Sequence, residues 1–553
     1  MSGSMLDTSV LIGGRAGEGI NVAGMGVARL LGRLGYYTYM YFDYPSLIKG
    51  GHNFGVIRAS EEKITAHRNR ADFIIALNQD TIDMHRDVTG PDTVIVYDSS
   101  RAKSDGTGVP VDEILKTENA PPIMLNSCML GAFAHTAGIP WEVVEEVFRK
   151  HLPKATEQNL RVARRGYDAG SVQRAVPSIG REPLPAISGN EAIGIGLVRG
   201  GLEAYVAYPM TPTSNLLHFL AEQADAFGLT VLHPENEIAV MLAALGFSYA
   251  GKKTAVGTSG GGFCLMTEGF SLAGQAEIPV VVVMGQRTGP STGLPTYSAQ
   301  SDLLFILHAG QGEFPRFVVA PGDAEEACAW SAVALQVAWQ FQVPAVILGD
   351  KTLCEGIFSY DEQLVRPEKV AGPGEPVEMP YRRYADTPSG ISPLHSPPLP
   401  GAVIKVNGYA HDESGVTTES PGTVNLMVEK RIRKEHALNE AVIGMDAVGV
   451  SGSPEATTAL LCWGSTKGVC REVAGRLGIR AVQPIVLSPF PVDQFRMALR
   501  GIRHLIAVEE NVYGQLATLI RRYGFEVQDS IGRYDGRPFS VDALEAEVRK
   551  VVR

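Results

Sequence analysis

The sequence predicts an α/β protein with three parallel-sheet domains, and three observations support this fold class. Short apolar runs such as residues 72–77, 279–285 and 504–511 are typical of strands buried on both faces of a sheet. Between such runs, apolar residues recur every three or four positions, as they do from 237 to 251, which indicates amphipathic helices. Strands that alternate with helices favour parallel sheets, which bind ligands outside the carboxyl ends of their strands.

Length and composition restrict the function classes. The chain has 553 residues, enough for about three or four domains, and its net charge of −11 argues against nucleic acid as the main partner. Apolar runs such as 278–285 are under half of the ~20 residues that a membrane-spanning helix needs, so we expect no membrane segment. No basic stretch precedes an apolar one at the N-terminus, so we expect no signal peptide and a cytoplasmic location.

Two compositional breaks divide the chain into three globular stretches. The first stretch covers residues 1–173 and ends at a Pro- and Gly-rich linker, residues 174–190. The second covers residues 191–365. A Pro-rich segment, residues 366–440, follows it, and we expect this segment to wrap over a surface as ordered irregular chain that ends in a basic helical patch. The third stretch covers residues 441–553.

The cysteines do not form a metal motif. None belongs to a CxxC pair, and no histidine lies at zinc-finger spacing from any of them. We therefore expect free thiols in a reducing compartment and no metal site on this chain. An iron–sulfur cluster needs four closely spaced cysteines, which this chain does not offer. The six are Cys128, Cys264, Cys328, Cys354, Cys462 and Cys470.

Two glycine-rich turns follow apolar runs. The first, IGGRAGEGIN (12–21), could direct backbone N–H groups at a phosphate, but its spacing is not GxGxxG and Glu18 would repel a phosphate. Both a dinucleotide site and a tight turn packing helix on sheet stay open there. The second, GTSGGGFCLMTEG (257–269), allows close approach of a ligand to the backbone, or serves packing alone. No P-loop, HExxH or GxSxG motif occurs, so nothing supports a kinase or a hydrolase.

Three further loops follow predicted strands between residues 205 and 300. The loop AYPMTPTSN (207–215) is stiffened by two prolines and suits a small anion through the hydroxyls of Thr211, Thr213 and Ser214. In HPENEIAVML (233–242), Glu235 and Glu237 begin an apolar helix. Stabilisation by the helix dipole is the simpler interpretation, but the Glu237 carboxylate could also lie in a pocket of low dielectric constant.

The last of these loops begins at Arg287, directly after a predicted strand. A segment rich in Gly and Pro follows and presents Ser291, Thr292 and Thr296. An arginine at a strand end often forms only a surface ion pair. With hydroxyl groups converging on it from a rigid loop, it is instead suited to clamp a carboxylate.

Together these segments resemble the α subunit of 2-oxoacid:ferredoxin oxidoreductases. The segments that carry the resemblance are YPMTPTS (208–214), ENEIA (235–239), GTSGGGF (257–263) and QRTGPSTGLPT (286–296). The C-terminal part of that subunit is resembled by GYAHDESG (408–415), KRIRK (430–434), EENVYGQL (509–516) and RYDGRPFS (533–540). The family's γ domain is resembled by GGRAGEGI (13–20) and YPSLIKGGHNFGVIR (44–58). This γ–α fusion looks most like the large subunit of the two-subunit 2-oxoglutarate enzymes.

The resemblance implies three domains and an activity. They are a γ domain associated with coenzyme A (CoA) at 1–173, a thiamine pyrimidine-binding domain at 191–365 and a transketolase C-terminal-like domain at 441–553. The enzymes use thiamine diphosphate, CoA and iron–sulfur clusters to convert a 2-oxoacid into CO2 and an acyl-CoA, and they reduce ferredoxin. For this chain the resemblance favours conversion of 2-oxoglutarate to succinyl-CoA, or the reverse reductive carboxylation.

The resemblance also assigns roles to residues. The glutamate that activates thiamine falls on Glu237, which fits the spacing to the GTSGGG turn better than Glu235. Thr211 and Arg287 would bind the substrate's carboxylate and keto groups, and Thr296 would line the same pocket. Met210 stands where isoleucine is usual, which is a small change in volume. The other expected ligand contacts are Tyr208, Pro209, Gly260 and Gly261 for thiamine, and Lys49, Gly50 and Gly51 for CoA.

The motifs that are missing imply a partner. The chain has neither the GDG motif that holds diphosphate through a metal nor the cluster cysteines. In the family both lie on a β subunit. The resemblance therefore implies that Mg2+ and a [4Fe-4S] cluster are held by a β subunit, that the assembly is (αβ)2, and that this chain alone is inactive.

Other functions stay open on the sequence alone. The same chemistry could act on pyruvate or a branched 2-oxoacid, because much of the side-chain pocket would come from the β chain. A non-redox thiamine enzyme of the transketolase type is a second alternative, although it would need a GDG motif on some chain. A non-catalytic nucleotide-binding or scaffolding subunit is a third.

Overall fold

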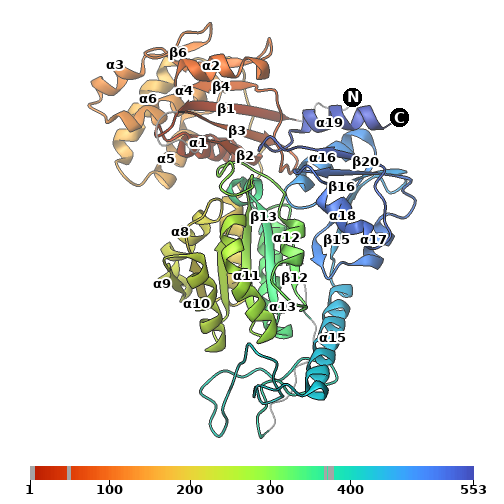
Figure 1. The fold of residues 1–553 in the computed structure, drawn as a ribbon. Helices are drawn as coiled ribbons and strands as arrows, with labels where there is room; N and C mark the ends of the chain where they lie inside the picture. The colour runs from red at the N-terminus through yellow and green to blue at the C-terminus, as the bar shows by residue number, and fades with distance from the viewer. Residues whose placement is uncertain (1–5, 46–50, 367–369, 371–378, 553) are drawn as a thin grey trace.

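A computed structural model describes residues 6–45, 51–366, 370 and 379–552. It confirms the predicted α/β class. The described residues form sheets of eight, seven and five strands, and helices cover these sheets (Figure 1). The second and third sheets are mostly parallel, whereas the first is mixed, with three parallel and four antiparallel strand pairings. The first sheet lies at the top of Figure 1, the second below it, and the third beside both.

The first sheet has the order β6-β5-β4-β1-β3-β2-β14-β7. β1, β4, β5 and β6 are parallel, whereas β3 is antiparallel to both β1 and β2. The connection between β2 and β3 is too short for a parallel crossover, which explains the antiparallel pair. The strands contributed by the first stretch are β1 (Asp7–Arg15), β2 (Tyr37–Asp43), β3 (His52–Ser60), β4 (Phe73–Ala76), β5 (Val94–Asp98) and β6 (Thr107–Val109). Its helices are α1 (Ile20–Arg33), α2 (Gln79–Met84), η1 (Arg86–Val88), α3 (Val111–Thr117), η2 (Pro122–Met124), α4 (Leu125–Thr136), α5 (Trp141–His151) and α6 (Thr156–Ala169).

Two strands from beyond the first stretch complete this sheet. β7 (Ala186–Ser188) lies inside the segment expected to be a linker, and β14 (Ile357–Ser359) follows the second sheet in the chain. β14 pairs antiparallel with β2 on one side and with β7 on the other. Helix α7 (Gly189–Arg199) then begins with a capping box at Ser188, so the second domain starts within the expected linker.

The second sheet has the order β18-β12-β13-β11-β10-β8-β9, and all its strands are parallel except β18. All seven residues of β11 are buried, as expected for a strand with helices on both faces. The strands are β8 (Ala204–Ala207), β9 (Thr230–Leu232), β10 (Thr254–Thr258), β11 (Val280–Gln286), β12 (Phe317–Val319), β13 (Pro344–Asp350) and β18 (Val486–Ser488). The helices after α7 are α8 (Ser214–Glu222), α9 (Ala224–Phe227), α10 (Glu237–Tyr249), α11 (Gly260–Gln275), α12 (Leu303–His308), α13 (Ala324–Phe341), α14 (Lys351–Glu355) and η3 (Glu362–Leu364).

The Pro-rich segment is irregular from 379 to 420 and then forms α15 (Pro421–Ile443), a helix longer than the basic patch that the sequence indicated. Lys430 and Lys434 of α15 are buried and pair with Glu277, which lies between α11 and β11. Arg383 of the irregular part donates to the Gln342 side chain at 2.7 Å. Buried charges are costly unless paired, so this cluster fixes the segment to the second domain.

The third sheet has the order β15-β17-β16-β19-β20. Only β15 is antiparallel to its neighbour among these described strands. The strands are β15 (Val448–Gly452), β16 (Thr458–Leu461), β17 (Arg480–Pro484), β19 (His504–Glu509) and β20 (Asp529–Gly532). The helices are α16 (Thr466–Leu477), α17 (Val492–Ala498), α18 (Gln515–Arg521) and α19 (Val541–Val551).

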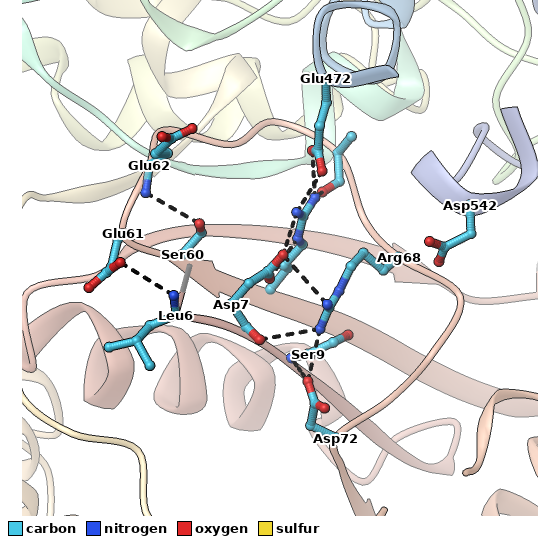
Figure 2. Close-up of polar contacts among 12 residues, drawn as sticks. Leu6, Asp7, Ser9, Ser60, Glu61, Glu62, Arg68, Asp72, Glu472 and Asp542 are labelled. Atoms are coloured by element: carbon cyan, nitrogen blue, oxygen red, sulfur yellow. Dashed lines mark hydrogen bonds and ion pairs between the residues drawn. The ribbon is translucent and has the colours of Figure 1, made fainter. Parts of the chain in front are cut away.

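An arginine-centred cluster joins the first and third domains. Arg58 of β3, which is 1% exposed, donates to both carboxylate oxygens of Asp7 (2.9 and 2.7 Å) and to both of Glu472 on α16 (2.7 and 2.8 Å). Figure 2 shows Glu472 reaching down from its helix towards Asp7, with Arg68 beside Asp7 and Asp72 below it. Bidentate arginine–carboxylate pairs of this kind fix the relative orientation of the two groups as well as their distance. The first and third domains therefore meet in one arrangement.

The described residues bear on two expectations from the sequence: the state of the cysteines and the absence of a membrane-spanning helix. All six cysteines are free thiols; five are buried, and Cys264 on α11 is exposed. None of the helices in the described ranges is long and apolar enough to cross a membrane.

Candidate active site

Three loops that the sequence singled out meet at one edge of the second sheet. β8, β10 and β11 are parallel neighbours, so their carboxyl ends lie side by side. The loop at 208–213 follows β8, the glycine turn follows β10 and the Arg287 loop follows β11. α10, which carries Glu237, packs against α11 and so belongs to the same edge. This is where a sheet of this type binds its ligands.

Glu237 is the first residue of α10 and is only 5% exposed. Asn236 caps the helix, because its side-chain oxygen accepts from the backbone N–H of Ala239 at 2.9 Å. Glu235 is exposed and contacts only the Asn236 side chain among the hydrogen bonds resolved for it. The capping role therefore belongs to Asn236, and the carboxylate of Glu237 is left free to turn into the protein.

The three consecutive glycines of the turn have three different neighbours. A Cβ on Gly262 would lie 2.7 Å from Oε1 of Glu237 and 2.2 Å from the Thr258 hydroxyl, so only glycine leaves room for that carboxylate. Gly261 is exposed and has no heavy atom within 4 Å of its Cβ position. Gly260 faces Asp302. The sequence had suggested Gly260 and Gly261 as ligand contacts; the structural need at Gly262 was not foreseen.

Arg287 and Thr211 lie together. The Arg287 guanidinium is half-buried, and its Nη1 donates to the backbone carbonyl of Thr211 at 3.1 Å. Burial lowers the pKa of Arg287, and the charge of Asp302 opposes that shift. Thr213 does not offer a free hydroxyl, because its Oγ1 donates to the carbonyls of Met210 (3.0 Å) and Thr258 (3.3 Å). Of the threonines in the first loop, Thr211 is therefore the one beside the clamp.

Thr296 is buried, and its hydroxyl donates to the backbone carbonyl of Tyr44 in the first domain at 2.7 Å. It was expected to line the substrate pocket. In this structure its hydroxyl is directed at the segment after β2, while Ser291 and Thr292 lie exposed at the loop tip. The Arg287 loop thus connects the carboxyl edge of the second sheet to the first domain.

Asp302 is a site residue that the sequence analysis missed. It precedes α12, and its backbone N–H donates to Oε1 of Gln286 at 3.0 Å, the residue before Arg287. Its Oδ2 is buried without a hydrogen-bond partner and lies 3.0 Å from the Cβ position of Gly260. Burial raises the pKa of Asp302 to about 6, against the opposing charge of Arg287. In the sequence, Asp302 is an acid directly before an apolar segment. Acids are common at the start of helices, so this pattern alone did not indicate a site residue.

The expected contacts Tyr208 and Pro209 follow β8 at the same edge of the second sheet. Tyr208 is 37% exposed and meets the ring of His233 edge-on at 5.8 Å. Ser259, which precedes α11, keeps a buried hydroxyl without a partner. A buried acid, an open glycine and an unpaired hydroxyl fit a flat heterocycle with polar edges, as the pyrimidine half of thiamine diphosphate is.

The N-terminal glycine turn holds a side chain of its own. Oε2 of Glu18 accepts from the backbone N–H of Arg15 at 2.7 Å, and Oε1 pairs with Arg101 at 3.0 Å. A carboxylate therefore occupies the position that a phosphate would need in a dinucleotide site, which favours the packing interpretation. The Gly51 carbonyl accepts from the N–H of Ala16 at 3.2 Å, so the two N-terminal motifs adjoin. The other expected CoA contacts, Lys49 and Gly50, lie outside the described residues.

Within the described ranges, three or more His, Cys, Asp or Glu side chains nowhere lie together in a position to hold a metal ion.

Comparisons with known proteins agree with the motifs. A family model described as pyruvate flavodoxin/ferredoxin oxidoreductase, thiamine diphosphate-binding, matches residues 195–430, and one described as pyruvate ferredoxin/flavodoxin oxidoreductase matches residues 9–169. The chain is 30% identical to the α subunit of 2-oxoacid:ferredoxin oxidoreductase 2 from Aeropyrum pernix, over 99% of this chain and 98% of that one. It is 31% identical to the 2-oxoglutarate oxidoreductase subunit KorA of Mycobacterium tuberculosis, over 77% and 68% of the two chains.

A solved structure is similar along its whole length. It is the 2-oxoglutarate:ferredoxin oxidoreductase from Magnetococcus marinus with 2-oxoglutarate, coenzyme A and succinyl-CoA bound. It matches with a TM-score of 0.88 and 29% identity, over 99% of this chain and 100% of that one. The shared fold therefore includes all three sheets and the way they meet.

Proposed function

The chain belongs to the α subunits of the 2-oxoacid:ferredoxin oxidoreductases, and we propose that its substrate is 2-oxoglutarate, which it converts to succinyl-CoA and CO2 together with a β subunit. It is one subunit of an oxidoreductase and contains a thiamine diphosphate-binding domain. Two similar proteins bear 2-oxoglutarate in their names, which supports this substrate over pyruvate or a branched 2-oxoacid. CoA as acyl acceptor and ferredoxin as electron acceptor are part of the proposal.

The observation that carries the proposal is the placement of Glu237 and Arg287 around one glycine turn. Thiamine diphosphate, when bound, supplies a carbon nucleophile that adds to the keto group and stabilises the charge left by CO2 loss. Glu237 would hold a proton at the pyrimidine N1′ from its buried position beside Gly262. Burial suits this role, because it strengthens a hydrogen bond to a charged group.

The substrate's carboxylate would bind the Arg287 guanidinium, which can donate two parallel hydrogen bonds to the two carboxylate oxygens. The Thr211 hydroxyl would donate to the keto oxygen, because Arg287 is already tied to the backbone of Thr211. Gly261 would allow the heterocycle to approach the backbone, and Tyr208 would cover its open side. The residues proposed for these roles, Arg287, Thr211, Gly261 and Tyr208, all belong to this chain.

A β subunit would complete the site. Ile238 and Leu242 on α10 and Leu265 on α11 are exposed apolar side chains close to Glu237, and they support a partner surface there. That partner would hold the diphosphate, Mg2+ and the [4Fe-4S] cluster, in an (αβ)2 assembly. CoA would reach the site from the first domain, where Lys49, Gly50 and Gly51 stay a prediction.

The test uses the complex of this chain with its β subunit, loaded with thiamine diphosphate and Mg2+. Reduction of a low-potential acceptor is followed with CoA and, in turn, 2-oxoglutarate, pyruvate and 2-oxoisovalerate. We expect CoA-dependent reduction with 2-oxoglutarate. A stronger signal with another acid would overturn the substrate, and none with any acid would favour a non-redox thiamine enzyme.

Glu237→Gln tests the role of the buried acid, with Glu235→Gln as the matched control on the same helix start. We expect Glu237→Gln to lower kcat by roughly 10²- to 10⁴-fold, the usual range for a lost acid–base group, and Glu235→Gln to leave it unchanged. Full activity in Glu237→Gln would instead indicate a scaffolding role for this chain.

A further inference from the structure

Asp302 is a half-buried residue with a buried carboxylate oxygen, Oδ2, and the mechanism above does not use it. Three observations place it at the substrate clamp: its main chain is bound to the Gln286 side chain, one residue before Arg287; its carboxylate lies against Gly260; and its Oδ2 has no hydrogen-bond partner. A buried polar atom without a partner is uncommon and calls for an explanation. Ser259 presents a second one at the same turn.

The relation of Asp302 to Arg287 is electrostatic and not a direct ion pair. The Nη1 atom of Arg287 donates to the carbonyl of Thr211, and the charge of Asp302 raises the pKa of Arg287 against the effect of burial. In the substrate-free protein Asp302 therefore serves as the counter-charge of the clamp. A 2-oxoacid carboxylate bound to Arg287 would take over that role and would repel a second negative charge beside it.

We propose that Asp302 is a positioning residue of the 2-oxoacid clamp, which takes up one proton from the solvent when the substrate carboxylate binds Arg287. As an ionised carboxylate, it balances the charge of the guanidinium in the substrate-free protein and competes with the substrate carboxylate. As a neutral acid, Asp302 no longer competes with the substrate carboxylate for Arg287. Its protonated oxygen becomes an O–H group that can donate a hydrogen bond. The inference rests on the proposed function, because it needs a 2-oxoacid at Arg287.

Among the neighbouring acids, Asp302 is the one whose charge acts on Arg287. Arg287 faces it from the end of β11, and the uncharged start of α11 faces it at Gly260. Glu237 lies at the same turn, but it contacts Gly262, two residues further along α11. On the side of the third domain, Glu510 receives a hydrogen bond at its backbone carbonyl from the N–H of Gln300, and its carboxylate is held by Ser298. The pKa of Asp302, raised by burial to about 6, lies where proton uptake can be measured.

Linkage gives the expected pH dependence. Above the pKa of the free enzyme, binding that takes up one proton weakens by up to about tenfold per pH unit, until the pKa of the complex is reached. We expect KM for 2-oxoglutarate to rise in this way between pH 6.5 and 8.5 in the wild-type complex. In Asp302→Asn, which resembles the neutral acid, KM should be nearly independent of pH and lower than the wild-type value at pH 8. Glu235→Gln removes an exposed acid nearby and should keep the wild-type slope.

Calorimetry separates this inference from the proposed function. In the αβ complex carrying Glu237→Gln, which binds without turning over, 2-oxoglutarate is titrated at pH 7.5 in two buffers of different ionisation enthalpy. We expect an uptake of close to one proton, abolished in Glu237→Gln/Asp302→Asn. Binding without proton uptake, or the same uptake in both proteins, would overturn the role of Asp302 and leave the function standing. Absence of binding for all three 2-oxoacids would overturn both.

Discussion

The Thr296 hydroxyl donates to the backbone carbonyl of Tyr44 at 2.7 Å, across 252 positions of sequence. This bond connects the Arg287 loop to the segment that follows β2 in the first domain. Two further contacts hold the same segment: Nζ of Lys351 donates to the carbonyl of Phe42 at 2.7 Å, and the Tyr44 hydroxyl donates to Glu355 at 3.0 Å. These hydrogen bonds therefore hold the Arg287 loop against the first domain, at the carboxyl edge of the second sheet.

Thr296→Val should loosen this joint while keeping the side chain's shape. The Tyr44 carbonyl would lose its donor in a partly buried position, which costs up to about 1–3 kcal/mol. We expect a lower thermal unfolding temperature and a higher KM for the 2-oxoacid, with Thr296→Ser close to wild type in both. Unchanged stability and kinetics in the valine variant would show that the bond does not support the loop.

Arg58→Ala should destabilise the boundary between the first and third domains. The change leaves Asp7 and Glu472 facing each other without their shared cation, and the loss of one member of a buried ion pair costs about 3–5 kcal/mol. Denaturant unfolding of the purified chain measures this loss. Arg33→Ala is the matched control, because Arg33 forms a single exposed ion pair with Glu146 and its loss should cost under about 1 kcal/mol. An equal loss of unfolding free energy in Arg58→Ala and Arg33→Ala would contradict the role of Arg58 in stabilising this boundary.

Glu510 should make stability depend on pH. Burial and the charge of Asp350 raise its pKa to about 8, so the folded state keeps a proton that the unfolded chain releases near the ordinary glutamate pKa of 4.5. The folded state is thus favoured at low pH, and this contribution is lost as the pH rises towards 8.

The measurement is the unfolding temperature of wild type and Glu510→Gln from pH 5.5 to 8.5. We expect the variant to gain stability relative to wild type as the pH increases, because glutamine cannot ionise. The difference between the two proteins isolates Glu510 from other groups that titrate in this range, such as Lys434, whose pKa burial lowers to about 7. Parallel curves would mean that Glu510 does not titrate in this window.

The sequence could predict the features that depend on local pattern. Continuous apolar runs identified the buried parallel strands such as β11, and the rule that ligands bind at carboxyl ends brought Thr211, Glu237 and Arg287 to one edge. Thr296 was expected in the pocket, but the direction of its hydroxyl depends on where the first domain packs.

Features that depend on packing between distant segments could not be predicted. β7, β14 and β18 are three residues long, too short for a pattern, and only their neighbours in space make them strands. The same holds for Asp302: nothing along the chain indicates that its carboxylate meets Gly260, because that contact depends on how α12 is placed against α11. For α15, Pro421 at the first turn was a local start signal, but it lay in a segment whose prolines favoured irregular chain.

The pairing of β2 with β14 has a consequence for how the polypeptide can be divided. If the backbone were cut between residues 170 and 185, the N-terminal fragment would lose β7 and β14 and would present the edge of β2 to solvent. An open edge of this kind recruits any extended strand, so the free fragment would tend to associate with itself. Supplied with the remaining chain, it would instead find its own missing strands there. Two separately translated fragments would therefore reassemble through the main chain, by adding strands to an unfinished sheet.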